Sequence, residues 1–134
     1  MPIRIYYEDT DCGGMVYYAN YLRYFERGRT EFLRERGVSL AEFHDRGQVF
    51  VVTRVSVQYL SPCRYGDLLL LDTRVSGDSG ATITFEYSVR KEGHDGEAVR
   101  GTVVLACVGR DNRPVRIPEE VKAALGMQIG GQGA

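Results

Sequence analysis

The 134-residue sequence has no tryptophan, only two histidines and only three cysteines. An odd number of cysteines without a Cys-x-x-Cys pair argues against both a disulfide framework and a structural zinc site. Two histidines, His44 and His94, cannot form a three-histidine metal site, and their number and placement argue against a Cys-His or Ser-His-Asp hydrolase. We therefore expect no bound metal and a reduced, cytoplasmic setting.

Net charge and long apolar runs are also missing. The 17 basic and 18 acidic residues leave a net charge of −1, which excludes a chain built for non-specific nucleic-acid binding. No stretch approaches the roughly 18 apolar residues of a membrane helix, and the N-terminus does not read as a secretion signal. We expect one globular domain over residues 1–126, a disordered tail over 127–134, no nucleic-acid partner and no membrane span.

What the sequence does contain is clear hydrophobic periodicity. Apolar residues at spacings of three, four and seven predict a long helix over 17–36. Within it, Gly28 costs about 1 kcal/mol relative to alanine, and we expect it to admit a close backbone neighbour. Alternation with a period of two predicts strands elsewhere. The predicted strands are 3–7, 49–59, 68–76, 81–91 and 98–110, and short helical segments are predicted at 40–45 and 119–125.

The connections between the last four strands are short and rich in turn residues. Such links demand antiparallel neighbours, because a parallel pair needs a long crossover. The chain is therefore predicted to be an α+β protein in which a curved five-stranded antiparallel sheet wraps one long helix. Because the strands are so apolar, we expect an edge or face of the sheet to pair with a second copy of the chain.

A polar, glycine-containing loop leads directly into the long helix and carries Glu8, Asp9 and Asp11. One interpretation is that these carboxylates only cap the helix and complement its dipole. The other is catalytic. Unpaired N–H groups at a helix start can hold an oxyanion, while a carboxylate beside them attacks a carbonyl or activates a water. Acyl transfer would then need no histidine, serine nucleophile or metal.

The segment YEDTDCGGMVYYANYLRYFERGRTEFLRERG, residues 7–37, resembles the signature of hotdog-fold acyl-CoA thioesterases. It is similar to 4-hydroxybenzoyl-CoA thioesterases and more closely to the acyl-CoA thioesterase branch associated with the Tol–Pal system. Weaker similarity continues through YLSPCRYGDLLLLDTRV. The resemblance implies a hotdog fold and hydrolysis of an acyl-CoA to a free carboxylic acid and coenzyme A, without a separate cofactor.

The resemblance also implies roles for individual residues. Asp11 matches the catalytic carboxylate, acting as nucleophile or general base, and the main-chain N–H of Tyr18 matches the group that polarises the thioester carbonyl. Asn20 and Glu26 fall on motif positions, where roles in positioning the substrate or in structure are expected. Arg64 is a candidate for the coenzyme A phosphates by its charge. The family's site lies at a dimer interface, and its dimers commonly pair into homotetramers.

Two alternatives remain open. A hotdog dehydratase or hydratase would use a histidine with a carboxylate, and the motif loop contains no histidine. A module that binds acyl thioesters without turnover would be expected to lack the carboxylate at position 11. The sequence does not specify which acyl group is bound.

Overall fold

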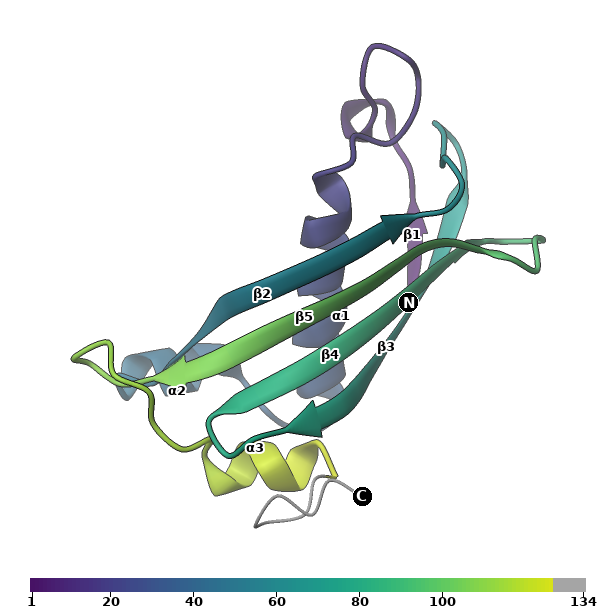
Figure 1. Cartoon of the computed structure of the whole chain (residues 1–134). Coiled ribbons are helices and arrows are strands. Elements are labelled where there is room, and N and C mark those ends of the chain that lie inside the picture. Colours follow the sequence, from purple (N-terminus) through teal and green to yellow (C-terminus); the bar gives the residue numbers. More distant parts are fainter. Residues whose placement is uncertain (127–134) are drawn as a thin grey trace.

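The computed structural model of the chain describes residues 1–126 and contains one five-stranded antiparallel sheet with a long helix against one face (Figure 1). The strand order is β1-β3-β4-β5-β2. The strands are β1 (Pro2–Arg4), β2 (Val49–Tyr59), β3 (Leu68–Asp78), β4 (Thr82–Lys91) and β5 (Glu97–Val108). The helices are η1 (Tyr7–Asp9, a 3-10 turn), α1 (Asn20–Glu35), α2 (Leu40–Asp45) and α3 (Glu119–Ala124). The predicted α+β class is confirmed, while the predicted tail over 127–134 lies outside the described residues.

The largest departure from the predicted boundaries lies before the long helix. Strand β1 ends at Arg4 rather than at residue 7, and α1 begins at Asn20 rather than at residue 17. The Tyr17 N–H donates to the Asp9 carbonyl at 2.9 Å, which holds this part of the chain outside the helix. The loop therefore extends further than periodicity predicts, because main-chain pairing across it outweighs the local helical pattern.

The core lies between α1 and the concave face of the sheet. Tyr21, Tyr24, Phe25, Gly28 and Leu33 form the buried stripe of the helix. In β4, alternate residues are buried against this stripe, as expected for a sheet with one covered face. The Phe25 ring stacks on the Tyr87 ring of β4, with centroids 4.3 Å apart. This helix–sheet contact fixes where the N-terminal end of α1 projects.

Gly28 allows α1 to approach β3 closely. A Cβ at this position would lie 2.6 Å from Thr73 Oγ1 and 2.7 Å from Leu71 Cδ2. The atoms that occupy the space beside Gly28 are these two side chains, and the β3 backbone that carries them runs close to α1, as expected. The glycine is needed because the Leu71 and Thr73 side chains of β3 fill the space that a Cβ would occupy.

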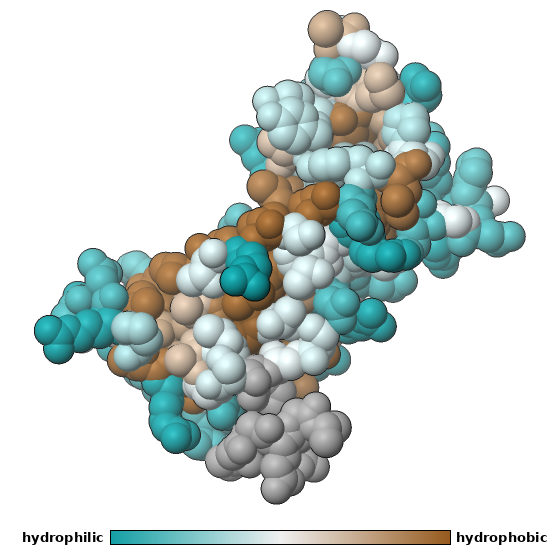
Figure 2. All heavy atoms as spheres, in the orientation of Figure 1, coloured by the Kyte–Doolittle hydropathy of each residue, from teal (hydrophilic) through white to brown (hydrophobic). Residues whose placement is uncertain are grey.

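Strand β2 forms one edge of the sheet and leaves apolar side chains in solvent. It pairs only with β5, so its other edge carries no strand partner within residues 1–126. The exposed fractions of Val51, Val52 and Val55 are 37%, 47% and 42%. Figure 2 shows hydrophobic residues gathered over this edge. Separately, none of the helices in the described part of the chain is long and apolar enough to cross a membrane.

Candidate functional site

The loop between η1 and α1 folds back on itself in a tight, hairpin-like turn. Thr10 and Val16 form an isolated antiparallel bridge, and the Asp11 N–H donates to the Met15 carbonyl at 2.8 Å. Gly14 closes the turn with a φ of +78°, a conformation that favours glycine. The turn places Asp11 at its base, on an exposed part of the chain directly before α1.

The Asp11 carboxylate is held by main-chain donors of its own loop. Its Oδ1 accepts hydrogen bonds from the Gly13 N–H at 2.8 Å and the Met15 N–H at 3.3 Å. Across residues 1–126, its Oδ2 makes no hydrogen bond. One oxygen therefore fixes the orientation of the group, and the other is available to attack a carbonyl carbon or to accept a proton.

Two main-chain N–H groups just before α1, those of Tyr18 and Ala19, are free to donate a hydrogen bond to a ligand. The Asn20 N–H donates to the Tyr17 carbonyl at 2.9 Å, which closes a turn over Tyr18 and Ala19. In the described part of the chain, the N–H groups of Tyr18 and Ala19 donate to no protein acceptor. They lie at the positive end of the helix dipole, where donors of this kind stabilise a developing oxyanion.

Asp11 and Tyr18 line the same pocket, which has a volume of about 420 Å³. The rest of its lining is mostly apolar or aromatic. These residues are Met15, Val16, Tyr21, Tyr59, Leu60, Ser61 and Pro62. A mostly apolar cavity lined by one carboxylate residue and by Tyr18, whose N–H is free, is suited to an apolar acyl group attached to a reactive carbonyl.

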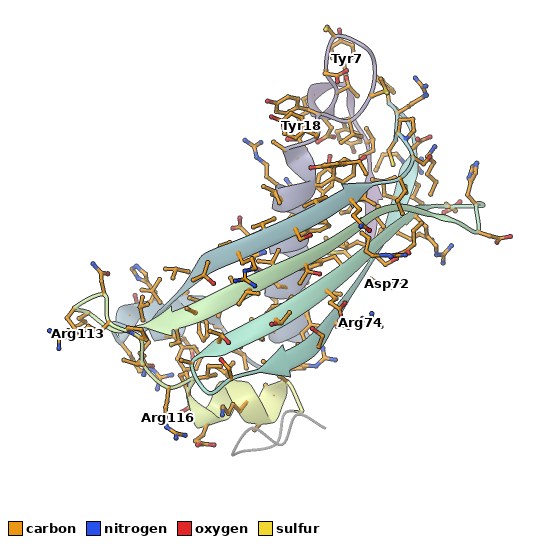
Figure 3. All side chains as sticks on the ribbon, viewed as in Figure 1. Tyr7, Tyr18, Asp72, Arg74, Arg113 and Arg116 are labelled. Atoms are coloured by element: carbon orange, nitrogen blue, oxygen red, sulfur yellow. The ribbon has the colours of Figure 1, made fainter. Side chains whose placement is uncertain are left out.

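A second concavity, of about 470 Å³, lies on the face of the sheet that points away from α1. Asp72 and Arg74 of β3 line it, and Figure 3 shows both on the sheet, away from Tyr18 at the start of α1. Arg74 is 3.4 Å from Glu86, and Arg100 pairs with Glu97. These cations are thus matched by neighbouring carboxylates, and the concavity is separate from the pocket that Asp11 lines.

Asp9 organises the loop rather than facing the pocket. Its carbonyl accepts from the Tyr17 N–H at 2.9 Å and from Asn20 Nδ2 at 2.8 Å, and its Oδ2 accepts from the Tyr6 N–H at 2.8 Å. Burial, together with the nearby Asp9 carboxylate, raises the pKa of the Tyr24 hydroxyl. That hydroxyl makes no hydrogen bond among residues 1–126. Asp9 therefore ties the end of η1 to the start of α1.

The remaining predicted site residues do not line the pocket. Asn20 uses its side-chain amide to bind the Asp9 carbonyl, as described above. Glu26 lies further along α1 on its exposed side, and Arg64 is exposed in an isolated bridge with Met15 of the motif loop. The structure thus brings Asp11 and Tyr18 together, and contact of the other three residues with substrate stays a prediction.

Sequence reasoning missed Tyr59, which β2 delivers to the pocket from 41 positions away in the chain. Its hydroxyl donates to the Tyr18 carbonyl at 3.2 Å. Its ring centroid is 6.3 Å from that of Tyr18 and 5.7 Å from that of Tyr21. Burial raises the pKa of the Tyr59 and Tyr21 hydroxyls, so both remain protonated and able to donate at neutral pH. The sequence signal that could have pointed to Tyr59 is its place at the end of a predicted strand, directly before a turn that contains Pro62.

The three cysteines are expected to differ sharply in reactivity. Cys12 is exposed in the motif loop, whereas Cys63 and Cys107 are buried. Burial raises the pKa of both buried thiols, so little thiolate forms at neutral pH. We expect an aromatic disulfide reagent to label one thiol per folded chain quickly and the other two only in denaturant.

Cys12→Ser is the control for this labelling experiment, and it should remove the fast phase alone. Fast labelling of two or more thiols in the folded wild-type chain would contradict the assignment. The same variant also removes the background in any assay that measures released thiol.

Within residues 1–126, no group of three or more histidine, cysteine, aspartate or glutamate side chains is arranged to hold a metal ion. The chemistry described above uses only a carboxylate, main-chain donors and an apolar wall.

Comparison with known proteins relates the chain to one group. Residues 6–125 match the thioesterase-like superfamily. The acyl-CoA thioesterase YbgC of Haemophilus influenzae is 42% identical over 126 residues, covering 92% of this chain and 91% of that protein. The crystal structure of a hypothetical protein from Aquifex aeolicus superposes with a TM-score of 0.87 at 32% identity, covering 93% of this chain and 97% of that one. A 1,4-dihydroxy-2-naphthoyl-CoA thioesterase from Synechocystis shares the fold, with a TM-score of 0.89, 19% identity and coverage of 94% and 93%.

Proposed function

The chain belongs to the thioesterase-like superfamily, and from this we propose that it is an acyl-CoA thioesterase, hydrolysing an acyl-CoA to a free carboxylic acid and coenzyme A. The resemblance read from residues 7–37 is confirmed at the level of the family. The observation that carries the proposal is that one mostly apolar pocket is lined both by Asp11, which has a free carboxylate oxygen, and by Tyr18, which has an unpaired N–H.

The proposed reaction begins with the acyl group in the apolar pocket and the thioester carbonyl at the start of α1. The Tyr18 N–H donates to the carbonyl oxygen and stabilises the negative charge that forms on attack. Removing one such donor from an enzyme typically costs 10²–10³ in kcat, or about 2.7–4 kcal/mol. The main-chain N–H is independent of the side chain at position 18, so tyrosine there is compatible with this role.

Asp11 supplies the second half of the reaction, by one of two routes with the same geometry. In the first, its Oδ2 attacks the carbonyl carbon, the C–S bond breaks and coenzyme A leaves, and water then hydrolyses the acyl–aspartate anhydride. In the second, Oδ2 takes a proton from a water molecule as that water attacks the same carbon; the C–S bond then breaks, and the proton passes from Asp11 to the departing thiolate. Either route ends with a free acid, coenzyme A and a regenerated carboxylate.

The direct test is release of thiol from a panel of acyl-CoAs spanning short, medium and long aliphatic chains and benzoyl groups, using Cys12→Ser protein. We expect turnover on at least one class of acyl group. Tight binding of acyl-CoAs without any hydrolysis would instead support a binding module. A hydratase is less favoured, because neither His44 nor His94 lines the pocket, and hydration of an enoyl-CoA without thiol release would be its sign.

We further propose that two copies pair through the free edge of β2 in the cytoplasm. The edge offers unpaired main-chain groups over 11 residues and exposed apolar side chains, both of which favour addition of a strand. Antiparallel pairing of identical edges obeys a two-fold axis. Pairing of such dimers into a homotetramer follows from the family resemblance, contact of Arg64 with coenzyme A phosphates follows from its charge alone, and both stay predictions.

Light scattering is expected to give at least twice the mass of one chain. Val55→Lys should shift the population toward monomer, because a charge on an edge strand opposes strand addition. Glu92→Lys, on an exposed turn after β4, is the matched control and should leave the mass unchanged. A wild-type chain that is monomeric at micromolar concentration would contradict the proposal.

A further inference from the structure

We propose that the Tyr59 hydroxyl is a positioning group for the reaction, which holds the main chain of Tyr18 so that its N–H meets the thioester carbonyl in a fixed direction. The inference rests on the proposed thioesterase function and gives β2 a part in the chemistry at the start of α1. In this role Tyr59 does not touch the reacting atoms, because it acts only through the Tyr18 carbonyl.

The start of α1 is weakly closed by its own main chain. Ala19 occupies the N-cap position and has no side-chain oxygen with which to bind the N–H groups of the first turn. The Tyr21 N–H instead donates to the Tyr18 carbonyl at 3.4 Å, and the Leu22 N–H donates to the Ala19 carbonyl at 3.2 Å. Both bonds are longer than the distance of about 2.9–3.0 Å that is commonest for N–H···O bonds. A contact from outside the helix can therefore decide how firmly this turn is held.

Tyr59 supplies such a contact from the sheet. Its hydroxyl donates to the Tyr18 carbonyl at 3.2 Å, closer than the Tyr21 N–H that shares the same oxygen. Tyr59 is the last residue of β2, where that strand pairs with β5. The N–H groups of the two residues that follow it both donate to the Ala98 carbonyl, at 2.8 and 3.0 Å. The hydroxyl is thus carried by a firmly paired part of the sheet.

The ring that carries this hydroxyl is also restrained, and the hydroxyl is kept in its donating form. The Tyr59 ring meets the Tyr18 ring edge to face, with centroids 6.3 Å apart, and the ring of the buried Tyr21 lies 5.7 Å away. Burial and the neighbouring Tyr18 raise the pKa of Tyr59, so its hydroxyl stays protonated at neutral pH. The hydroxyl is therefore directed at Tyr18 before substrate binds, as preorganisation of a catalytic donor requires.

Tyr18 is thereby held on both sides of its Cα. On one side, the Tyr17 carbonyl accepts from the Asn20 N–H at 2.9 Å. On the other side, the Tyr18 carbonyl accepts from Tyr59. A trans peptide is planar, so each bond to a carbonyl also sets the direction of the N–H in the same peptide. Without the Tyr59 bond, the chain before α1 would rotate more freely at this point, and the Tyr18 N–H would turn relative to the pocket.

The effect should fall on kcat rather than on KM. The Tyr18 N–H matters most when negative charge forms on the carbonyl oxygen, and a misdirected donor stabilises that charge less well. Loss of an interaction that is made only in the transition state lowers kcat and kcat/KM equally. A residue that only shaped the pocket wall would instead change KM.

The experiment compares the steady-state kinetics of Tyr59→Phe and the unsubstituted residue on the best acyl-CoA of the panel, both in the Cys12→Ser background. Phenylalanine keeps the ring and its contacts with Tyr18 and Tyr21 and removes only the hydroxyl. We expect kcat to fall about three- to tenfold, the rate equivalent of one neutral hydrogen bond, with KM unchanged. Replacing Tyr59 with 4-aminophenylalanine, whose amine can donate to the same carbonyl, should restore part of the loss.

Infrared spectroscopy gives a readout that needs no turnover. A ketone analogue of the substrate, in which a methylene group replaces the thioester sulfur, keeps the carbonyl and cannot be hydrolysed. Its isotope-labelled carbonyl should stretch at a lower frequency when bound to wild type than when bound to Tyr59→Phe, because a well-directed donor polarises the C=O bond. Tyr65→Phe is the matched control, since this exposed tyrosine lies against Tyr7 and outside the pocket. Its kinetics and spectrum should equal those of the wild type.

An unchanged kcat in Tyr59→Phe, shown by circular dichroism to be folded, or a rise in KM alone would overturn the positioning role. Equal carbonyl frequencies in wild type and Tyr59→Phe would do the same. Hydrolysis of no acyl-CoA by the wild type would overturn the thioesterase function instead. In that case the spectrum of the bound ketone still decides whether Tyr59 directs the Tyr18 N–H.

Discussion

Replacing Asp11 with asparagine is expected to lower kcat by about 10²–10⁴-fold, the usual contribution of a positioned acid–base group. The amide oxygen of asparagine can still accept the hydrogen bonds of the Gly13 and Met15 N–H groups, so the loop should keep its shape. What is lost is a group able to attack the thioester or to take a proton from water. Steady-state kinetics on the best acyl-CoA of the panel measure the effect, and circular dichroism confirms folding.

Asp9→Asn is the matched control in the same loop. Its main-chain carbonyl, which holds Tyr17 and Asn20, is unaffected by the substitution, and an amide oxygen can still accept from the Tyr6 N–H. We expect a clearly smaller loss of kcat than for Asp11→Asn. Near-wild-type turnover by Asp11→Asn would remove Asp11 from the chemistry, and the reverse ranking of the two variants would assign the reaction to Asp9.

Gly101→Ala is expected to reduce the free energy of unfolding by about 3 kcal/mol, at the upper end of the usual cost of overpacking a core. A Cβ on Gly101 of β5 would collide with the Phe25 ring, meeting its Cζ at 2.6 Å. The ring is fully buried and stacked on Tyr87, so it has no room to retreat. Urea denaturation of the two proteins measures the difference at constant protein concentration.

Two further variants identify the cause of this loss. Gly96→Ala, in the turn before β5, adds the same methyl group where no atom lies within 4 Å, and its stability should stay close to that of the wild type. In a Phe25→Leu background, the smaller side chain leaves space for the new methyl group, so Gly101→Ala should cost less than it does alone. An equal cost in both backgrounds would locate the problem in the strand rather than in the contact with Phe25.

Local regularities in the sequence were sufficient for most of the fold. The switch from a helical period to a period of two after Gly47 predicted α1 and the four long strands, and the short turns between strands required antiparallel neighbours. These features depend on residues within a few positions of one another. In α1 and in β4, the apolar residues of the pattern are also the ones that the fold buries. The start of α1 was misplaced because hydrogen bonds to Asp9 hold Tyr17 outside the helix.

The same distinction between local and long-range information applies to the candidate site. Asp11 and the Tyr18 N–H could be named from the sequence because they lie only seven residues apart, in one loop that leads into a helix. The resemblance to a known family then gave each of them a role. Tyr59 could not be named, since its place beside Tyr18 depends on a register that includes a shift between Val52 and Arg54. A one-residue slip in pairing reverses which face every later side chain occupies. That choice is made by long-range packing of β2 against β5, and no local pattern in the chain encodes it.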